Sequence, residues 1–395
     1  MKIVIVGAGK VGVALTRHLA VENRVTVIDQ NPHLVENIIN IYDVMGVCGN
    51  GASYDVQKEA DVEQADLLIA TTSSDEINIL TCLVAKKMGV QHTIARIRSP
   101  EYGRQLRFMR SELGLSMAIN PEAATAREIA RVLRFPTAMK LESFSKGRLE
   151  LVEYRVAEHT ALDGTRLSEL YRNFKVRVLI CAVARQGETI IPSGDFTLRA
   201  GDKIYLTAAP RELEKFFRLL GVFRARASSV MIVGASKMCY YLASELLEMG
   251  MSVKIIDQNE QRCVEMSEKL PRALVIVGDG TDSELLSEEG ISQTDAFVAI
   301  TGLDEANILM ALSAAKQSGD CCKVVAKINR KSLLELVSTE SLIDSVVSTG
   351  AVTTELILQY IRAMKNASAS KVKTLHRIVD EKVEALEFSV TPDIS

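Results

Sequence analysis

The stretch IVIVGAGKVGVALTRHLA at residues 3–20 returns in altered form as VMIVGASKMCYYLASELL at residues 230–247. Two further segments repeat in the same order: VTVIDQN (25–31) returns as VKIIDQN (253–259), and ADLLIATTSSDEINIL (65–80) returns as DAFVAITGLDEANIL (295–309). The separation between equivalent residues drifts by only two positions over these segments. Such near-constant spacing indicates a duplicated domain with small changes in its loops.

Each copy alternates short β-branched apolar runs, such as 3–6 and 24–28, with helix-length amphipathic segments, such as 12–20. This alternation predicts an α/β fold whose parallel, doubly wound sheet is covered by helices on both faces. Between the copies, residues 141–207 are rich in strand-like runs and turn signals, which predicts a small α+β lobe with helices over 167–174 and 211–219.

The segment ALEFSV (385–390) matches LVEYRV (151–156), so we expect the small lobe to start again and to be truncated. The predicted fold is therefore two tandem Rossmann-like sheets, each followed by a small α+β C-terminal lobe. The predicted domains are a first Rossmann-like lobe (1–138), a first C-terminal lobe (139–221), a linker (222–228), a second Rossmann-like lobe (229–368) and the start of a second C-terminal lobe (369–395).

Charge and composition exclude several classes of protein. Lys and Arg number 47 against 50 Asp and Glu, and the formal net charge of -3 provides no field for holding nucleic acid. No apolar run approaches the roughly 20 residues that cross a bilayer, and no signal peptide is present, so we expect a cytoplasmic protein without direct membrane insertion. The seven cysteines are scattered and never spaced as CxxC, so no metal site is predicted.

A glycine loop follows the first predicted strand. Gly7, Gly9 and Gly12 have the GxGxxG spacing, and Asp29 stands at the end of the second predicted strand. In this pattern the glycines allow a tight turn and close approach of phosphate, and the acidic residue accepts hydrogen bonds from ribose hydroxyls. No Arg follows Asp29 to neutralise a 2′-phosphate, so NAD or an adenine nucleotide is favoured over NADP.

Polar residues after the third, fourth and fifth predicted strands lie where open α/β sheets bind ligands. The first predicted site comprises Gly7, Ala8, Gly9, Lys10, Val11, Gly12, Asp29, Gln30, Gly49, Asn50, Gly51, Thr72, Ser73, Asp75, Asn78 and Arg98. Three alternatives stay open: Lys10 as an ordinary exposed lysine, Ser73 or Ser74 as a helix cap, and Arg96 and Arg98 as partners in surface salt bridges.

No residue set in the sequence supports turnover. A dehydrogenase needs a substrate domain with a proton-transfer group over the nicotinamide, whereas here the glycine-loop lobe is followed by a small lobe and then by its own repeat. We predict a ligand-binding protein and not an enzyme. An NAD-dependent oxidoreductase of unknown substrate is the alternative, because this fingerprint is common in such enzymes.

The motifs GAGKVG (7–12), GNGA (49–52), TTSSDEIN (71–78), ARIRSPEY (95–102) and NPE (120–122), followed by IIPSGDFTLRAGDKIYL (190–206), resemble the TrkA family of regulatory subunits of bacterial Trk potassium uptake systems. The resemblance covers essentially the whole chain. It implies tandem RCK (KTN) units that bind NAD(H) and ATP or ADP. It also implies a homo-oligomeric ring, expected to be a tetramer, that gates a TrkH-like potassium channel or transporter from the inner face of the cell membrane.

By the same resemblance, Lys10 and Glu122 match positions that face a nucleotide's terminal phosphate, and Gly7, Gly9, Gly12, Asp29, Asn50, Thr72 and Arg98 match dinucleotide-facing positions. A carboxylate beside phosphate repels it unless an Arg or another cation mediates, so Glu122 would sense which nucleotide is bound, from a neighbouring subunit or through a metal. Alternatively, Glu122 is explained by the favourable macrodipole at a helix start after Pro121. Both interpretations stay open.

The second copy keeps Gly234 but replaces the other two glycines by Ser236 and Cys239, so we expect weaker pyrophosphate binding there. The counterpart of Glu122 falls near Thr349. A weaker dinucleotide site and an empty site are both open. The candidate residues of this second site are Gly234, Ser236, Lys237, Asp257, Gly278, Asp279 and Thr301.

The basic, aromatic segment KFFRLLGVFRAR (215–226) allows a further interpretation as an amphipathic membrane anchor. We favour the last helix of the small lobe followed by a linker, since short stretches of this kind are usually of that type.

Overall fold

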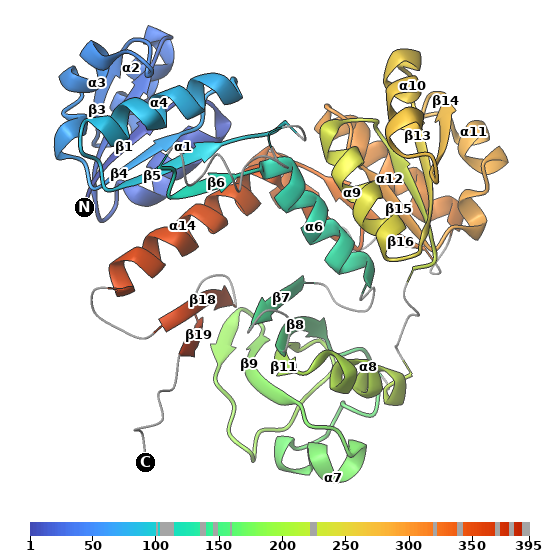
Figure 1. Cartoon of the computed structure of the whole chain (residues 1–395). Coiled ribbons are helices and arrows are strands. Elements are labelled where there is room, and N and C mark those ends of the chain that lie inside the picture. Colours follow the sequence, from blue (N-terminus) through green and yellow to red (C-terminus); the bar gives the residue numbers. More distant parts are fainter. Residues whose placement is uncertain are drawn as a thin grey trace.

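The computed structural model describes residues 1–99, 102, 114–134, 140–144, 149–158, 160–221, 227–318, 322–337, 343–367, 372–378 and 383–388. It contains two similar α/β halves and, below them, a smaller β-rich lobe (Figure 1). The predicted tandem Rossmann-like architecture is confirmed.

The first half is built on a six-stranded parallel sheet in the order β3-β2-β1-β4-β5-β6. Its strands are β1 (Lys2–Val6), β2 (Arg24–Asp29), β3 (Met45–Cys48), β4 (Leu67–Ala70), β5 (His92–Arg96) and β6 (Met117–Ile119). Its helices are α1 (Lys10–Leu19), α2 (Pro32–Ile41), α3 (Tyr54–Glu59), η1 (Val62–Gln64), α4 (Asp75–Lys87) and α6 (Pro121–Arg134).

Alternate residues of β1 enter two different cores. Ile3 and Ile5 pack with α1 and α2 on one face of the sheet, and Val4 and Val6 pack with α3 and α4 on the other. Burial on both faces explains why the strands read as continuous apolar runs. Because the strand order reverses between β1 and β4, a crevice opens at the carboxyl ends of these two strands.

The second half repeats this topology in the order β14-β13-β12-β15-β16-β17. Its strands are β12 (Ser229–Val233), β13 (Ser252–Asp257), β14 (Leu274–Val277), β15 (Ala296–Ala299), β16 (Lys323–Lys327) and β17 (Ser345–Val347). Its helices are α9 (Lys237–Glu248), α10 (Glu260–Lys269), α11 (Ser283–Glu288), η4 (Ile291–Gln293), α12 (Asp304–Ser318), α13 (Lys331–Val337) and α14 (Thr349–Ala367). The equivalent crevice lies between β12 and β15.

The small lobe is an antiparallel sheet in the order β10-β9-β11-β8-β7 with a core on its helical side. Its strands are β7 (Lys140–Phe144), β8 (Leu149–Arg155), β9 (Leu179–Arg185), β10 (Glu188–Ile190) and β11 (Lys203–Ala208). Its helices are η3 (Leu167–Glu169), α7 (Leu170–Phe174) and α8 (Pro210–Leu219). The helices expected over 167–174 and 211–219 are therefore present.

Helix α8 decides between the two interpretations of residues 215–226. Phe216 and Phe217 are 0% and 4% exposed in the core of the small lobe, so the side chains that would enter a membrane are already buried. The membrane-anchor interpretation is wrong for this helix, while residues 222–226 lie outside the described residues. In the described part of the chain, no helix is both long and apolar enough to cross a bilayer.

The last helix of each half packs on the other half. Helix α6 lies against α9, and its Ala126, Ile129 and Leu133 belong to the core under the second sheet. Helix α14 lies against α1, and its Ile357 and Ile361 belong to the core under the first sheet. Figure 1 shows α6 and α14 side by side between the halves. The two halves are therefore joined by exchanged helices.

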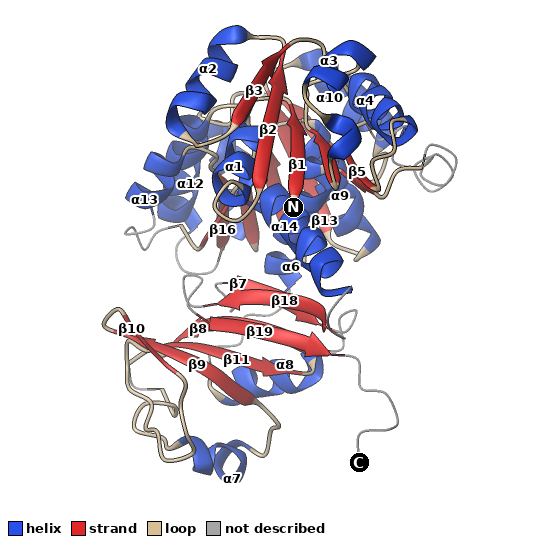
Figure 2. Cartoon of the chain, turned by 90° about the vertical axis from the view of Figure 1, so that its left-hand side faces the viewer, coloured by secondary structure: helices blue, strands red, loops and turns tan. Residues whose placement is uncertain are grey.

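The last two described strands, β18 (Val372–Ile378) and β19 (Val383–Phe388), form an antiparallel pair. The pair lies beside the sheet of the small lobe (Figure 2), and Val383 packs against Leu151, Ala182 and Tyr205 on the face opposite the lobe's main core. β18 and β19 thus follow the second half as β7 and β8 follow the first, in line with the predicted restart of the small lobe.

Candidate functional site

The first glycine loop turns tightly between β1 and α1. Gly7 has φ +104°, in the left-handed region that favours glycine, and its N–H donates to the Ile28 carbonyl at 2.8 Å. A Cβ on Gly12 would lie 1.8 Å from the Gly7 carbonyl oxygen, so no other residue fits there without movement of the backbone. These two glycines are required by the fold of the loop itself.

Gly9 is different, because an added Cβ would meet nothing within 4 Å. It is the N-cap of α1, and no side chain accepts a hydrogen bond from the first turn of this helix. The free N–H groups and the positive end of the helix dipole form a site that suits an anion such as phosphate. Lys10 is exposed beside it.

Asp29 closes the loop from the end of β2. Its Oδ2 accepts the Ala8 N–H at 2.6 Å and its Oδ1 accepts the Asn31 N–H at 2.9 Å. Both carboxylate oxygens thus have protein donors, and each retains a second lone pair for a ribose hydroxyl. Gln30 is exposed, and Val11 is buried in the first core.

The Gly49–Gly51 turn has a structural reason for its glycines. A Cβ on Gly49 would lie 2.7 Å from Val56 Cγ2, and one on Gly51 would lie 2.1 Å from Val6 Cγ1. Packing against the two valines therefore accounts for both glycines, which were predicted as site residues. Asn50 is exposed, and its Oδ1 accepts the Ala52 N–H at 3.0 Å.

Asn78 and Asp75 were predicted to contact the ligand directly, but both side chains are buried and bind other parts of the protein. Asn78 is fully buried; its Oδ1 accepts the N–H and hydroxyl of Thr72, and its Nδ2 donates to the Thr72 and Arg96 carbonyls. Asp75 is 8% exposed, and its Oδ2 accepts the N–H groups of Arg98 and Ser99 at 2.9 and 2.8 Å. Both side chains position the loops that border the site.

The cap of α4 is Ser74, whose Oγ accepts the Ile77 N–H at 3.2 Å, while Ser73 is exposed. Thr72 is held by Asn78 at the end of β4, with its hydroxyl 2.7 Å from the amide oxygen. Thr71, which is not among the predicted site residues, donates from Oγ1 to the Gly7 carbonyl at 3.3 Å and so supports the glycine loop.

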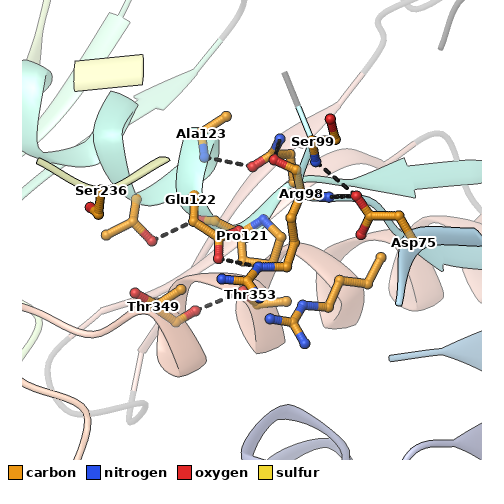
Figure 3. Close-up of polar contacts among 12 residues, drawn as sticks. Asp75, Arg98, Ser99, Pro121, Glu122, Ala123, Ser236, Thr349 and Thr353 are labelled. Carbon is orange, nitrogen blue, oxygen red and sulfur yellow. Dashed lines mark hydrogen bonds and ion pairs between the residues drawn. The ribbon is translucent and has the colours of Figure 1, made fainter. Parts of the chain in front are cut away.

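Arg98 and Glu122 form an ion pair with Nε and Oε1 2.5 Å apart (Figure 3). The Glu122 side chain is 9% exposed and that of Arg98 is 37% exposed, so the pair joins a buried carboxylate to a partly exposed guanidinium. Among the described residues, Glu122 Oε2 has no hydrogen-bond partner, and neither has the buried Arg96 Nε. Burial and the neighbouring Arg98 lower the pKa of Arg96 from its ordinary value. Of the possible mediators between Glu122 and a phosphate, the structure therefore supplies an Arg.

Both glycine loops open into one cleft of about 2480 Å³ between the two halves. From the first half it is lined by Gly9, Lys10, Arg96, Arg98 and Glu122. From the second half it is lined by Ser236, Lys237, Lys327, Arg330 and Thr349. Figure 3 shows Glu122 between the first-half Arg98 and the second-half Ser236 and Thr349. The Arg98–Glu122 end of the first site therefore faces the second half.

The second glycine loop caps the N-terminus of its own helix, α9, with a side chain. The Ser236 Oγ accepts the Cys239 N–H at 3.4 Å, which caps α9 in the place where the first loop leaves its helix uncapped. The Ser236 N–H also bonds back to the Gly234 carbonyl at 3.0 Å. An incoming phosphate would have to displace these contacts, so the departure from the glycine pattern has a concrete physical consequence.

The remainder of the second site repeats the first. Asp257 Oδ2 accepts the Ala235 N–H at 2.6 Å, and Asn307 holds the Thr301 hydroxyl at 2.7 Å. Asp279 is exposed with its pKa lowered by hydrogen bonds from Thr281, and Gly278 donates to the Asp257 carbonyl. Asn329 stands in place of Arg98 and Gly350 in place of Glu122, so the ion pair has no equivalent here.

No group of three or more His, Cys, Asp or Glu side chains in the described residues is arranged to hold a metal ion.

The TrkA-N domain model matches residues 3–121 and again 230–349, and the TrkA-C domain model matches residues 151–221. The chain belongs to the TrkA family. It is 34% identical over 391 residues to the Trk system potassium uptake protein TrkA of Vibrio alginolyticus, covering 98% of this chain and 84% of that protein. It is 32% identical over 374 residues to a TrkA homologue of Archaeoglobus fulgidus, covering 94% of this chain and 84% of that protein.

Solved structures with the same fold include the GsuK RCK domain, with a TM-score of 0.70 and 20% identity over 95% of this chain and 79% of that one. A structure described as the GsuK channel bound to NAD has a TM-score of 0.70 and 21% identity, covering 95% of this chain and 66% of that one. At this identity the likeness shows the RCK fold alone. The domain matches and the structural neighbours agree with the duplicated architecture of this TrkA-family chain.

Proposed function

We propose that this TrkA-family chain is a nucleotide-sensing regulatory subunit that gates a potassium uptake channel in the membrane. Its first glycine loop binds NAD(H) or an adenine nucleotide. The observation that carries the proposal is the uncapped N-terminus of α1 at Gly9, which lines the same cleft between the halves as the Arg98–Glu122 pair. Turnover plays no part in this proposal.

The residues of the first site fit a dinucleotide. Asp29 would accept hydrogen bonds from the ribose hydroxyls, and the N-terminus of α1 would bind the first phosphates. Lys10 and Arg98 would bind the more distant phosphates. A GsuK structure bound to NAD and another bound to ADP are related folds and support this choice of ligand class. The nucleotide would supply charge and shape to the cleft, and no chemical step is required of it.

The gating part of the proposal follows from the position of the site. A nucleotide that binds one arrangement of the two halves better than another shifts their equilibrium by its differential affinity. We propose that the shift passes through a ring of these subunits, a tetramer, to a TrkH-like membrane partner at the inner face of the membrane. The relatives named as Trk potassium uptake proteins and a neighbour described as a gating ring support this proposal.

Substitution of Gly9 by Ala tests the site without disturbing the fold. Because the new Cβ meets no protein atom and the backbone has φ −74°, the chain should fold normally while the methyl group blocks phosphate approach. We expect NADH and ATP affinity, measured by isothermal titration calorimetry, to fall by about tenfold or more, equivalent to about 1.4 kcal/mol.

The matched control is Gly194→Ala in the small lobe, where the nearest atom to an added Cβ is Ser168 Cβ at 3.7 Å. This variant should bind as the unmodified chain does. Equal affinities for Gly9→Ala and the control would contradict the proposed site. Steady consumption of NADH by the purified chain with cell extract would favour an NAD-dependent oxidoreductase instead.

A further inference from the structure

A tyrosine from the second half holds the backbone of the first site. The Tyr241 hydroxyl donates to the Arg98 carbonyl at 3.3 Å and accepts from Asn120 Nδ2 at 2.9 Å. Asn120 Nδ2 also donates to the Arg98 carbonyl at 3.3 Å. The three groups form a closed triangle of hydrogen bonds that spans the two halves.

This triangle fixes the residues that face the cleft. The Arg98 N–H is bound by Asp75 and its carbonyl by the triangle, so its backbone is held on both sides. Asn120 Oδ1 accepts the Ala123 N–H at 2.8 Å and so holds the start of α6, where Glu122 lies. The Arg98–Glu122 ion pair therefore depends on groups that Tyr241 contacts.

Tyr241 lies on α9, which starts at Lys237 directly after the second glycine loop. Tyr241 lies one helical turn after that loop, and its hydroxyl reaches the first site because α9 packs against α6. Movement of α9 relative to the first half would therefore carry the hydroxyl with it.

The contact is one-sided. In the repeat, Tyr241 corresponds to Ala14, which has no hydroxyl, and Arg98 corresponds to Asn329. Asn329 is engaged within its own half, where its Oδ1 accepts the Thr349 N–H at 3.1 Å. The Tyr241 hydroxyl thus binds the first site from the opposite half, at the position that we propose for a terminal phosphate, and Ala14 has no hydroxyl to do the same for the second site.

We propose that Tyr241 is a positioning residue, whose hydroxyl holds Arg98 and Glu122 for the terminal phosphate of a nucleotide in the first site and couples that phosphate to α9. This inference rests on the proposed nucleotide-binding function and adds the residue through which the second half senses the length of the phosphate chain. The phosphate of AMP reaches only the glycine loop, so the affinity for AMP should not depend on the Tyr241 hydroxyl.

The test is Tyr241→Phe, which keeps the ring and removes the hydroxyl. Tyr240→Phe is the matched control, because the Tyr240 hydroxyl forms no hydrogen bond with the described residues and its ring lies beside that of Tyr241. We expect Tyr241→Phe to weaken ATP binding about fivefold, the scale of one hydrogen bond, and AMP binding less than twofold. Equal losses for ATP and AMP would indicate a general structural role and overturn the proposal.

Hydrogen exchange gives a second readout that needs no nucleotide. Backbone amides of Arg98 and Ser99 should exchange at least threefold faster in Tyr241→Phe than in Tyr240→Phe, while the equivalent amides of Asn329 and Arg330 keep their rates. Unchanged exchange at Arg98 and Ser99 overturns the positioning role whatever the nucleotides do. If the unmodified chain binds none of NADH, ATP and AMP, the proposed function fails, and hydrogen exchange still decides whether the hydroxyl fixes Arg98.

Discussion

The same residue type serves two purposes within six residues of the first loop. Gly12 is glycine because the turn of Gly7 occupies the space of any side chain, whereas Gly9 is glycine although the protein leaves that space open. The first requirement comes from folding and the second, on our proposal, from the ligand. A GxGxxG pattern alone does not separate them, and the three-dimensional surroundings do.

This distinction predicts that an added methyl group lowers stability strongly at Gly12 and only slightly at Gly9. Gly12→Ala places a Cβ 1.8 Å from the Gly7 carbonyl, so we expect a loss of about 3 kcal/mol or more in the free energy of unfolding, the upper range for overpacking. Gly9→Ala should lose less than about 1 kcal/mol, since only the cap preference changes. Urea denaturation followed by circular dichroism measures both, and similar losses in the two variants would refute the distinction.

Among the elements, the two loop helices show what sequence reasoning can and cannot reach. The alternation of strands and helices and the order of both sheets follow from apolar periodicity and the repeat, so the fold was predictable. The replacement of Gly9 by Ser236 was visible too. That Ser236 caps α9, that Asn78 is saturated inside the protein, and that Tyr241 reaches Arg98 were not predictable, because each depends on side-chain direction or on contact between distant segments.

Strand β8 places a buried carboxyl against helix α6. Glu150 is 4% exposed and its Oε2 has no hydrogen-bond partner among the described residues. Burial raises the pKa of Glu150 above its ordinary value of 4.5, although Arg134 and Arg131 of α6 act in the opposite direction. For such a group the stabilising contribution is complete below the ordinary pKa and is lost as pH rises through the raised pKa.

We therefore expect Glu150→Gln to be more stable than the unmodified chain. This gain in the free energy of unfolding should be larger at pH 7.5 than at pH 4.5. The comparison is made by urea denaturation at the two pH values. Glu188→Gln, the same change at an exposed position of β10, should show no such pH dependence. A Glu150→Gln variant that is less stable at pH 7.5 would mean that attraction to the two arginines outweighs burial.

At the scale of the whole molecule, the exchanged helices make the stability of each half depend on the other. Ile129 belongs to the first half by sequence, yet it is fully buried under the second sheet. By contrast, Leu68 lies in a core made only of first-half residues. Local stability should therefore follow the packing and not the order of the domains along the chain.

Ile129→Ala should cost about 3 kcal/mol, typical of a large-to-small change in a core, and should speed hydrogen exchange in β12 of the second half. Leu68→Ala is the control and should speed exchange first in β1 and β4. The prediction fails if Ile129→Ala affects the first half and leaves β12 unchanged.

The exchange of α6 and α14 also decides what a break in the backbone would do. A polypeptide cut once between the small lobe and the second half would yield two fragments, and each would keep a helix whose apolar side chains are seated in the other fragment. The fragments should co-purify after such a nick and, when produced as separate chains, should assemble by complementation. Fusion or fission of the two repeats could thus occur without loss of the interface between them.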